Sequence, residues 1–330
     1  MSERVRVGLI GCGGIAIGHA QRLVAMPEAK VVALCDTSEA SIERLHKHLP
    51  ATKGLPAYSD YRELLEKERL DAVEIASPHT THFQQIMDSL DAGLHVLTEK
   101  PMVCSVAHAH EVVSKAGKSD KVMGISYQRH YMGAFRYMRE SFRKGDMGSL
   151  VFMSALQGQN WLRGTRGSWR QDPELSGGGQ LNDSGSHLLD IILWVSGMGV
   201  SDVFAYIDNC GAAVDINSAI SVRFDNGAQG SFSVVGHSKC GWWEDITFWG
   251  EEGTFFYRNG KLFEQLGDKG PAEVTKLPDF SNPDQNFIRS ILGKETMQVP
   301  PTCGLRVIEL TEAAWRSAEK GAPVKVERSA

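Results

Sequence analysis

Pairs of cysteines, long apolar runs and an excess of one charge are all missing from this chain of 330 residues. The six cysteines are scattered and none forms a C-x-x-C pair, so the sequence favours neither a zinc knuckle nor a redox dithiol. No apolar run reaches the roughly 18 residues that a membrane-spanning helix needs. The net charge of −5 gives no general attraction to nucleic acid or to an anionic membrane. We therefore expect neither of these partners.

The start of the sequence does not resemble a signal peptide. Residues 1–10 include charged side chains, their apolar run is short, and no small-residue cleavage site follows. Scattered cysteines indicate a reducing compartment, so a cytoplasmic protein is predicted. The length is that of about two domains. A hydrophobic fraction of 42% and a charged fraction of 23% are typical of a folded globular chain.

Residues 1–126 alternate short apolar runs with amphipathic stretches. The apolar runs, which indicate strands, lie at 5–10, 30–35, 71–76, 94–98 and 121–126. The helical patterns between them lie at 15–26, 38–49, 80–93 and 103–117. This alternation predicts a parallel sheet with right-handed crossover helices, which is a doubly wound α/β fold of the Rossmann kind.

Residues 127–330 show a different pattern. The expected strands lie at 150–156, 202–208, 218–224, 228–235, 253–258 and 261–265. The expected helices lie at 134–145, 188–198, 283–293 and 304–320. Asn226-Gly227 and Asn259-Gly260 each join two alternating runs, which is a strong hairpin signal. This part is therefore predicted to be an α+β domain with a mostly antiparallel sheet.

A glycine-rich turn joins the first expected strand to the first expected helix. It follows the pattern G-x-G-x-x-A with residues Gly11, Cys12, Gly13, Gly14, Ile15 and Ala16. In this pattern Gly11 permits a tight turn, Gly13 lets a pyrophosphate approach the backbone, and Ala16 lets helix and strand pack closely. The N-terminus of the helix then offers free N–H groups to the phosphates. The turn predicts a dinucleotide site.

Asp36 indicates which dinucleotide is bound. It lies twenty residues after Ala16, where a carboxylate is expected to hold the adenosine ribose hydroxyls. A carboxylate there would repel a 2′-phosphate, and Thr37 and Ser38 supply no compensating positive charge. NAD is therefore favoured over NADP. The simpler alternative is that Asp36 only caps the end of its strand.

The next two strands of the predicted parallel sheet end in polar segments. Ligands of such sheets bind outside the carboxyl ends of the strands. We therefore expect these segments to face the nicotinamide half of the cofactor. Their candidate residues are Ser77, Pro78, His79, His82, Glu99 and Lys100.

A second group of polar residues lies in the segment 177–190, which begins with three consecutive glycines. The glycines allow the backbone to approach another group closely. Asp183 and His187 are four residues apart and share a face if both lie on a helix. Asp190 is spaced to orient the His187 imidazole. The alternative is a capped helix whose histidine is satisfied in the core.

Together these motifs resemble the Gfo/Idh/MocA oxidoreductase family. The resemblance is carried by residues 11–16, by Glu99-Lys100-Pro101 and by the segment 177–190, and it extends to 168–170, 284–293 and 304–326. It implies a Rossmann domain, a second domain with a large open sheet, and NAD(P)-linked hydride transfer on sugars, inositols or related polyols. A cis Lys100–Pro101 bond is also implied. His79 departs from the family pattern, in which many members carry Asn.

By the same resemblance, Lys100, Asp183 and His187 are the catalytic residues. Oxidation of an alcohol removes a hydride from carbon and a proton from oxygen. An imidazole titrates near neutral pH, which suits His187 as the proton acceptor. Lys100 would stabilise the developing alkoxide, and Asp183 would hold a substrate hydroxyl or balance the charge of Lys100.

Tryptophans and arginines at 161–170 are further candidates for substrate binding. Trp161 and Trp169 offer apolar platforms for sugar faces, and Arg163 and Arg170, together with Arg166, are suited to an anionic group. The alternative is a loop packed by its tryptophans, with the arginines paired to nearby acids such as Asp172 and Glu174.

No metal is expected. His46 and His48 point apart on a helix, as do His108 and His110. His79 with His82 lacks a third ligand.

The leading interpretation is an NAD-dependent dehydrogenase that acts on a cyclic polyol. An NAD-dependent glycoside hydrolase or lyase and a non-catalytic nucleotide-sensing regulator are the alternatives. Domains are predicted at 1–126 for NAD and at 127–330 for substrate binding and oligomerisation. A dimer or tetramer is expected to form by packing of open sheet faces, onto which the pattern places Phe204, Phe224, Phe232 and Trp243.

Overall fold

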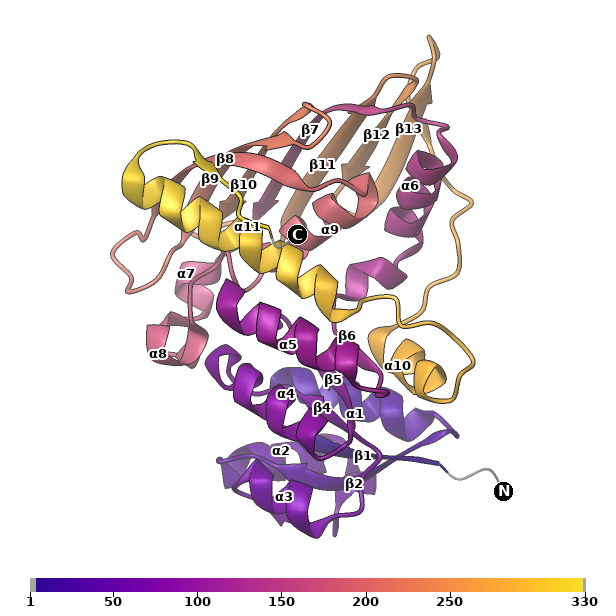
Figure 1. Ribbon diagram of the computed structural model, residues 1–330, viewed down its shortest axis with the longest axis vertical. Coiled ribbons are helices and arrows are strands. Elements are labelled where there is room, and N and C mark those ends of the chain that lie inside the picture. The colour runs from indigo at the N-terminus through magenta and orange to yellow at the C-terminus, as the bar shows by residue number, and fades with distance from the viewer. Residues whose placement is uncertain (1–3, 329–330) are drawn as a thin grey trace. The chain divides into compact units, whose positions relative to one another are not determined.

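The computed structural model describes residues 4–328, which form two compact units (Figure 1). The first unit comprises the described residues up to Val103 together with Ala107–Gln128 and Ser281–Leu305. The second comprises Cys104–Val106, Arg129–Phe280 and the described residues from Arg306 onward. The first three residues of the stretch compared above with a signal peptide lie outside the described residues.

The first unit is a doubly wound sheet whose order is β3-β2-β1-β4-β5-β6, with every pairing parallel. Its strands are β1 (Val5–Ile10), β2 (Ala29–Cys35), β3 (Ala57–Tyr58), β4 (Ala72–Ile75), β5 (His95–Thr98) and β6 (Met123–Ile125). Its helices are α1 (Gly14–Ala25), α2 (Glu39–His48), η1 (Pro50–Thr52), α3 (Tyr61–Lys67), η2 (His79–Thr81), α4 (His82–Asp91), α5 (Val106–Lys118) and α10 (Pro283–Ile291). This confirms the predicted Rossmann fold.

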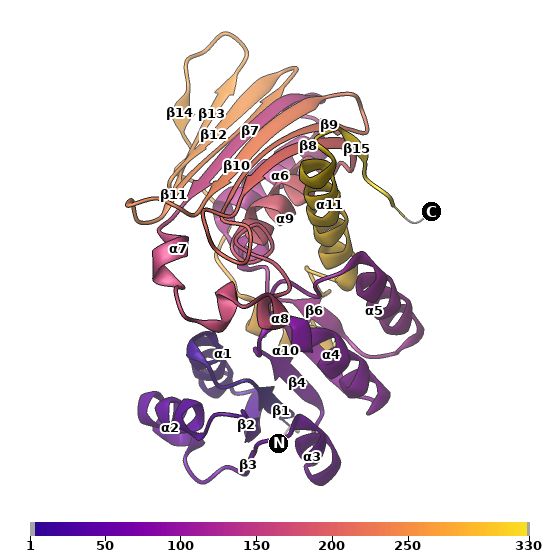
Figure 2. The same cartoon turned by 90° about the vertical axis from the view of Figure 1, so that its left-hand side faces the viewer.

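The strands of this sheet are nearly continuous apolar runs because helices cover both faces. Figure 2 shows α1 and α2 on one face and α3, α4 and α5 on the other. Helix α10 comes from much later in the chain, yet Phe287 and Ile288 are fully buried in the core cluster that includes Val7 and Leu9 of β1. The segment Ser281–Leu305 thus belongs to the first unit, whereas the sequence pattern places it in the second domain.

The second unit contains a sheet of nine strands in the order β14-β13-β12-β11-β7-β10-β9-β8-β15. The strands are β7 (Leu150–Gly158), β8 (Val200–Asp208), β9 (Asn217–Phe224), β10 (Gln229–Val235), β11 (Trp243–Gly250), β12 (Gly253–Arg258), β13 (Lys261–Leu266), β14 (Ala272–Glu273) and β15 (Val324–Lys325). The remaining helices are η3 (Gln128–Tyr131), α6 (Gly133–Lys144), α7 (Trp161–Gly164), η4 (Trp169–Gln171), α8 (Pro173–Ser176), α9 (Gly185–Ser196) and α11 (Pro301–Lys320). The β7–β10 pair is parallel and the other pairs are antiparallel, so the predicted mostly antiparallel sheet is confirmed.

Both predicted hairpins form at their Asn-Gly turns. Asn259 and Gly260 have positive φ angles of 45° and 100°, as a primed turn between two right-twisted strands requires. Gly227 has a φ of 88°, and its N–H donates to the Phe224 carbonyl in the turn between β9 and β10. The sequence pattern missed β11, which pairs with β7 and β12 inside the sheet.

Helices α6, α9 and α11 cover one face of this sheet (Figures 1 and 2). The strands alternate accordingly, and Phe224 and Phe232 are buried on the helix side, each only 1% exposed. Their prediction on the open face is therefore wrong. The reason is register, because Phe232 lies opposite the buried Ile220 of β9.

The open face of the sheet carries other side chains. Tyr206 is 71% exposed and Trp243 is 47% exposed, and Phe204 contacts Tyr206 edge to face. Serines and arginines such as Ser231 and Arg223 lie among these aromatic side chains, so the face is mixed in polarity. Within residues 4–328, no helix combines the length and the apolar character needed to cross a membrane.

Candidate functional site

The glycine-rich turn of the first unit has the geometry of a phosphate site. Gly11 has a φ of +92°, and a Cβ there would lie 2.5 Å from the Ala76 carbonyl carbon, so only glycine fits. Gly13 is the N-cap of α1 and has no side-chain cap, which leaves the first N–H groups of the helix facing outward. A Cβ on Gly13 would meet no protein atom within 4 Å. No contact among the described residues requires a glycine at this position, whereas a pyrophosphate bound at the helix N-terminus would require one.

Asp36 follows β2 and lies against this turn. One carboxylate oxygen accepts the Cys12 N–H at 2.7 Å, and the other accepts the Ser38 N–H at 2.8 Å. These bonds fix the carboxylate and leave further lone pairs for ribose hydroxyls. Burial, followed by the charge of Asp36, raises the pKa of the Cys12 thiol to about 12. Cys12 therefore stays protonated and acts as a small buried residue of the turn.

The segments after β4 and β5 are joined by a buried histidine. The two ring nitrogens of His82 lie 2.8 Å from the Pro101 carbonyl oxygen and 3.0 Å from that of Ser77. Burial lowers the pKa of His82, so the ring is neutral and donates to one carbonyl at a time. The Lys100–Pro101 bond is cis, as the family resemblance implies. His79 is also buried, 3% exposed, beside His82.

In the second unit, two predicted substrate residues donate hydrogen bonds to the carboxylate of a third. Asp183 is 5% exposed, and its Oδ2 accepts hydrogen bonds from Trp161 Nε1 at 2.9 Å and from Arg170 Nε at 3.0 Å. Trp161 is buried against Val214 and Ile216, so it supports Asp183 instead of offering an open ring face.

Arg170 thus pairs with Asp183 and not with the nearer acids of its own loop. Its guanidinium lies 4.4 Å from the centre of the Trp169 ring. Arg163 is exposed on α7, and Arg166 is exposed just after it. Asp172 accepts the Glu174 N–H as the N-cap of α8.

Asp183 and His187 are not on one helix. Helix α9 begins at Gly185, so His187 lies in its first turn, whereas Asp183 lies in the turn before it. Asp190, which the spacing assigns to the His187 imidazole, instead faces His130, with 2.8 Å between Oδ2 and Nε2. The local spacing is correct, but long-range packing selects different partners.

Gly179, the last of the three consecutive glycines, brings the backbone close to Asp215, which the sequence analysis missed. Asp215 accepts the N–H groups of Gly179 and Leu181 at 2.9 and 2.8 Å and that of Trp315 Nε1 at 3.2 Å. A Cβ on Gly179 would lie 1.9 Å from the Asp215 carbonyl oxygen. The glycines therefore serve a protein contact that shapes the turn before Asp183. The sequence signal that could have identified Asp215 is an acidic residue placed alone between the apolar Val214 and Ile216.

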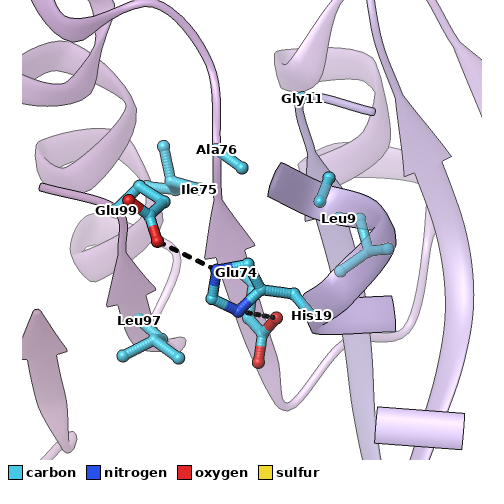
Figure 3. A pocket seen from close by; sticks show the side chains of 9 residues that line it. Leu9, Gly11, His19, Glu74, Ile75, Ala76, Leu97 and Glu99 are labelled. Carbon is cyan, nitrogen blue, oxygen red and sulfur yellow. Dashed lines mark hydrogen bonds and ion pairs between the residues drawn. The ribbon is translucent and has the colours of Figure 1, made fainter. Parts of the chain in front are cut away.

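A buried charged cluster lies next to Glu99, and the sequence analysis missed it too. Figure 3 labels three of its members, His19, Glu74 and Glu99. His19 of α1 lies between Glu99 and Asp284, with Nε2–Oε1 and Nδ1–Oδ1 distances of 3.1 and 2.8 Å. Arg22 Nε donates to the other oxygen of Asp284 at 2.5 Å. Glu74 Oε2 lies 3.5 Å from His19 Nδ1. We call these five residues the His19 cluster.

Protonation balances the charges of the His19 cluster. Burial opposes a charge on His19, but Asp284 and Glu99 outweigh it and raise the pKa of His19 well above its ordinary value. Burial, reinforced by the charge of Asp284, raises the pKa of Glu74 to about 8. Two cations then face two carboxylates and one carboxylic acid. His19, Glu74 and Asp284 are close enough to share a metal ion, but the Arg22 guanidinium already supplies a cation beside Asp284.

The Glu74 carboxyl should make stability depend on pH. Between about pH 4.5 and 8 the unfolded chain loses this proton and the folded chain keeps it, so stability falls as the pH rises through that window. Glu74→Gln removes this contribution, and the decrease in urea midpoint from pH 5 to pH 8.5 should become smaller. Glu43→Gln, at an exposed position on α2, is the matched control. An unchanged pH dependence in Glu74→Gln would show that the buried carboxyl is already ionised at neutral pH.

Comparisons with known proteins agree with this geometry. Residues 5–127 match the oxidoreductase family with an NAD-binding Rossmann fold, and residues 135–256 match the Gfo/Idh/MocA C-terminal domain. Myo-inositol 2-dehydrogenase of Thermotoga maritima is 26% identical over 343 aligned positions, covering 98% of this chain and 99% of that protein. D-glucoside 3-dehydrogenase of Escherichia coli is 25% identical over 358 positions, covering 98% of each chain.

Solved structures show the same fold at lower identity. A levoglucosan dehydrogenase in complex with NADH has a TM-score of 0.88 at 19% identity, covering 99% of this chain and all of that one. That structure has the fold of both units of this chain. The protein belongs to the Gfo/Idh/MocA family of NAD-dependent oxidoreductases.

Proposed function

We propose that this protein uses NAD to transfer a hydride between the cofactor and a hydroxyl or carbonyl group of a sugar, an inositol or a related cyclic polyol. The observation that carries this proposal is the Asp183 carboxylate, which Trp161 and Arg170 hold in a buried position one turn from His187. Relatives named for inositol and glucoside dehydrogenation support the substrate class.

NAD would be held by the residues of the first unit. The N–H groups at the start of α1 would bind the pyrophosphate, and Asp36 would bind the adenosine ribose. The segments Ser77–His79 and Glu99–Lys100 would line the nicotinamide half, with His82 fixing the first segment against Pro101. When bound, the nicotinamide ring supplies the hydride acceptor.

Lys100, Asp183 and His187 would carry out the proton chemistry. His187 accepts the proton of the reacting hydroxyl as a general base. The Lys100 ammonium stabilises the negative charge that develops on the substrate oxygen. Asp183 holds a second substrate hydroxyl, with its carboxylate oriented by Trp161 and Arg170. Trp169 and Arg163 would contact more distant parts of the substrate.

Loss of either proposed proton-handling group should stop turnover. His187→Ala and Lys100→Ala are each expected to reduce kcat by about 10²–10⁴-fold with little change in NAD affinity. Substrates are found by following NADH absorbance on a panel of sugars, inositols and sugar acids. His48→Ala, on the exposed end of α2, is the control.

If both variants keep more than about a tenth of wild-type kcat, the assignment of the catalytic residues is wrong and a nucleotide-sensing role is favoured. If a glycoside is cleaved without net NADH formation, the enzyme is a redox-assisted hydrolase or lyase.

Asp36 should give a preference for NAD over NADP of more than about tenfold in affinity, because a phosphate facing a carboxylate costs at least ~1.4 kcal/mol. Calorimetric titration of both dinucleotides measures this ratio. Asp36→Ser should reduce it by removing the negative charge, whereas Asp120→Asn, at an exposed carboxylate, should leave it unchanged. Equal or tighter binding of NADP by the wild type would contradict the proposal.

We also propose that the protein forms a dimer or tetramer through the open face of the nine-stranded sheet. Tyr206 and Leu156 project from that face and are 71% and 38% exposed, which favours burial in a partner. Tyr206→Lys combined with Leu156→Arg should shift the mass found by light scattering toward the monomer. Leu277→Arg, at an exposed apolar position outside the sheet, should not. A wild-type monomer at micromolar concentration would refute the proposal.

A further inference from the structure

We propose that His19 is a positioning residue, which sets the turn that carries Lys100 by holding the Glu99 carboxylate against helix α1. This inference rests on the proposed role of Lys100. It assigns a role to a side chain that is buried, only 3% exposed.

The first step of the argument is the short path from His19 to Lys100. The Nε2 atom of His19 lies 3.1 Å from Glu99 Oε1. The other carboxylate oxygen, Glu99 Oε2, accepts the backbone N–H of Lys100 at 3.2 Å. One carboxylate therefore joins the imidazole to the peptide group of Lys100. Figure 3 shows His19 between Glu99 and Glu74, with Gly11 at the edge of the same pocket.

The second step is that His19 itself is held in place. Its Nδ1 lies 2.8 Å from Asp284 Oδ1, and Asp284 is fully buried at the start of α10. Arg22, one turn after His19 on α1, donates to the second oxygen of Asp284. An imidazolium donates from both ring nitrogens, so it bonds Asp284 and Glu99 at once on opposite sides of the ring, whereas a neutral imidazole has only one N–H donor.

The third step concerns the two segments that the His19 cluster joins, helix α1 and the turn after β5. Helix α1 begins at the glycine turn proposed to bind the pyrophosphate, and Glu99 follows β5 at the carboxyl edge of the sheet. Hydrogen bonds between charged partners are stronger than those between neutral groups. The His19–Glu99 pair therefore fixes the Lys100 turn relative to the phosphate site. A misplacement of about 1 Å in such a group is enough to cost on the order of a hundredfold in rate.

The test compares kcat with the KM for NAD in the full-length enzyme. His19→Gln should lower kcat about tenfold to a hundredfold, with the KM for NAD within threefold of wild type, and Glu99→Gln should lower kcat by a similar factor. The double variant should be no slower than the slower single variant, because both changes break one link. Glu74→Gln is the matched control, since it alters the same cluster without touching the Glu99–Lys100 link, and it should keep wild-type kcat.

A general loss of packing would give a different result. In that case Glu74→Gln would lower kcat as much as Glu99→Gln, or the KM for NAD and the thermal midpoint would change together with kcat. Either result would overturn the inference, as would a wild-type kcat in His19→Gln.

The Lys100→Ala variant separates the two proposals. If Lys100→Ala keeps wild-type turnover, the role of Lys100 in the proposed function fails. If Lys100→Ala is inactive and His19→Gln is fully active, only the positioning role fails. When His19→Gln is added to the Lys100→Ala variant, the residual kcat should not fall further.

Discussion

In each unit one buried or half-buried carboxylate accepts two backbone N–H groups, at least one of them from a glycine-rich turn. Asp36 binds the N–H of Cys12 in the first unit and that of Ser38 beside it. Asp215 binds the N–H groups of Gly179 and Leu181 in the second unit. A turn that has no regular hydrogen-bond partners would leave these donors unsatisfied, at about 1–3 kcal/mol for each buried group. The carboxylate removes that cost and fixes the turn in one conformation.

This arrangement places the functional groups before any ligand arrives. The turn held by Asp215 leads directly into Asp183 and the first turn of α9. The turn held by Asp36 presents the first N–H groups of α1 outward. Rigid donors and acceptors of this kind bind charged or polar ligands with little loss of conformational freedom. The glycines are therefore used in two ways, for contact with protein at Gly11 and Gly179 and for open space at Gly13.

The sequence predicts what local spacing controls. The place of the glycine turn between β1 and α1 and the alternation of strands and helices follow from contacts within one strand–helix–strand unit, so they are correctly predicted. The His19–Asp284 contact joins residues 265 positions apart, and no local pattern encodes it. The predictions that Asp190 orients His187 and that Phe232 lies on the open face are wrong for the same reason. Each depends on which element packs opposite, and that is decided by the whole fold.

Local motifs and long-range packing correspond to two different parts of the proposed reaction, the recognition of the cofactor and the recognition of the substrate. Cofactor recognition depends on backbone N–H groups and one carboxylate, which a short motif can specify. The proposed substrate contact of Asp183 depends instead on Trp161 and Arg170, which orient its carboxylate from twenty-two and thirteen residues away. Relatives named for dehydrogenation of myo-inositol and of D-glucosides match nearly the whole chain. One scaffold can serve such different substrates because loops change specificity without disturbing the sheet that holds them.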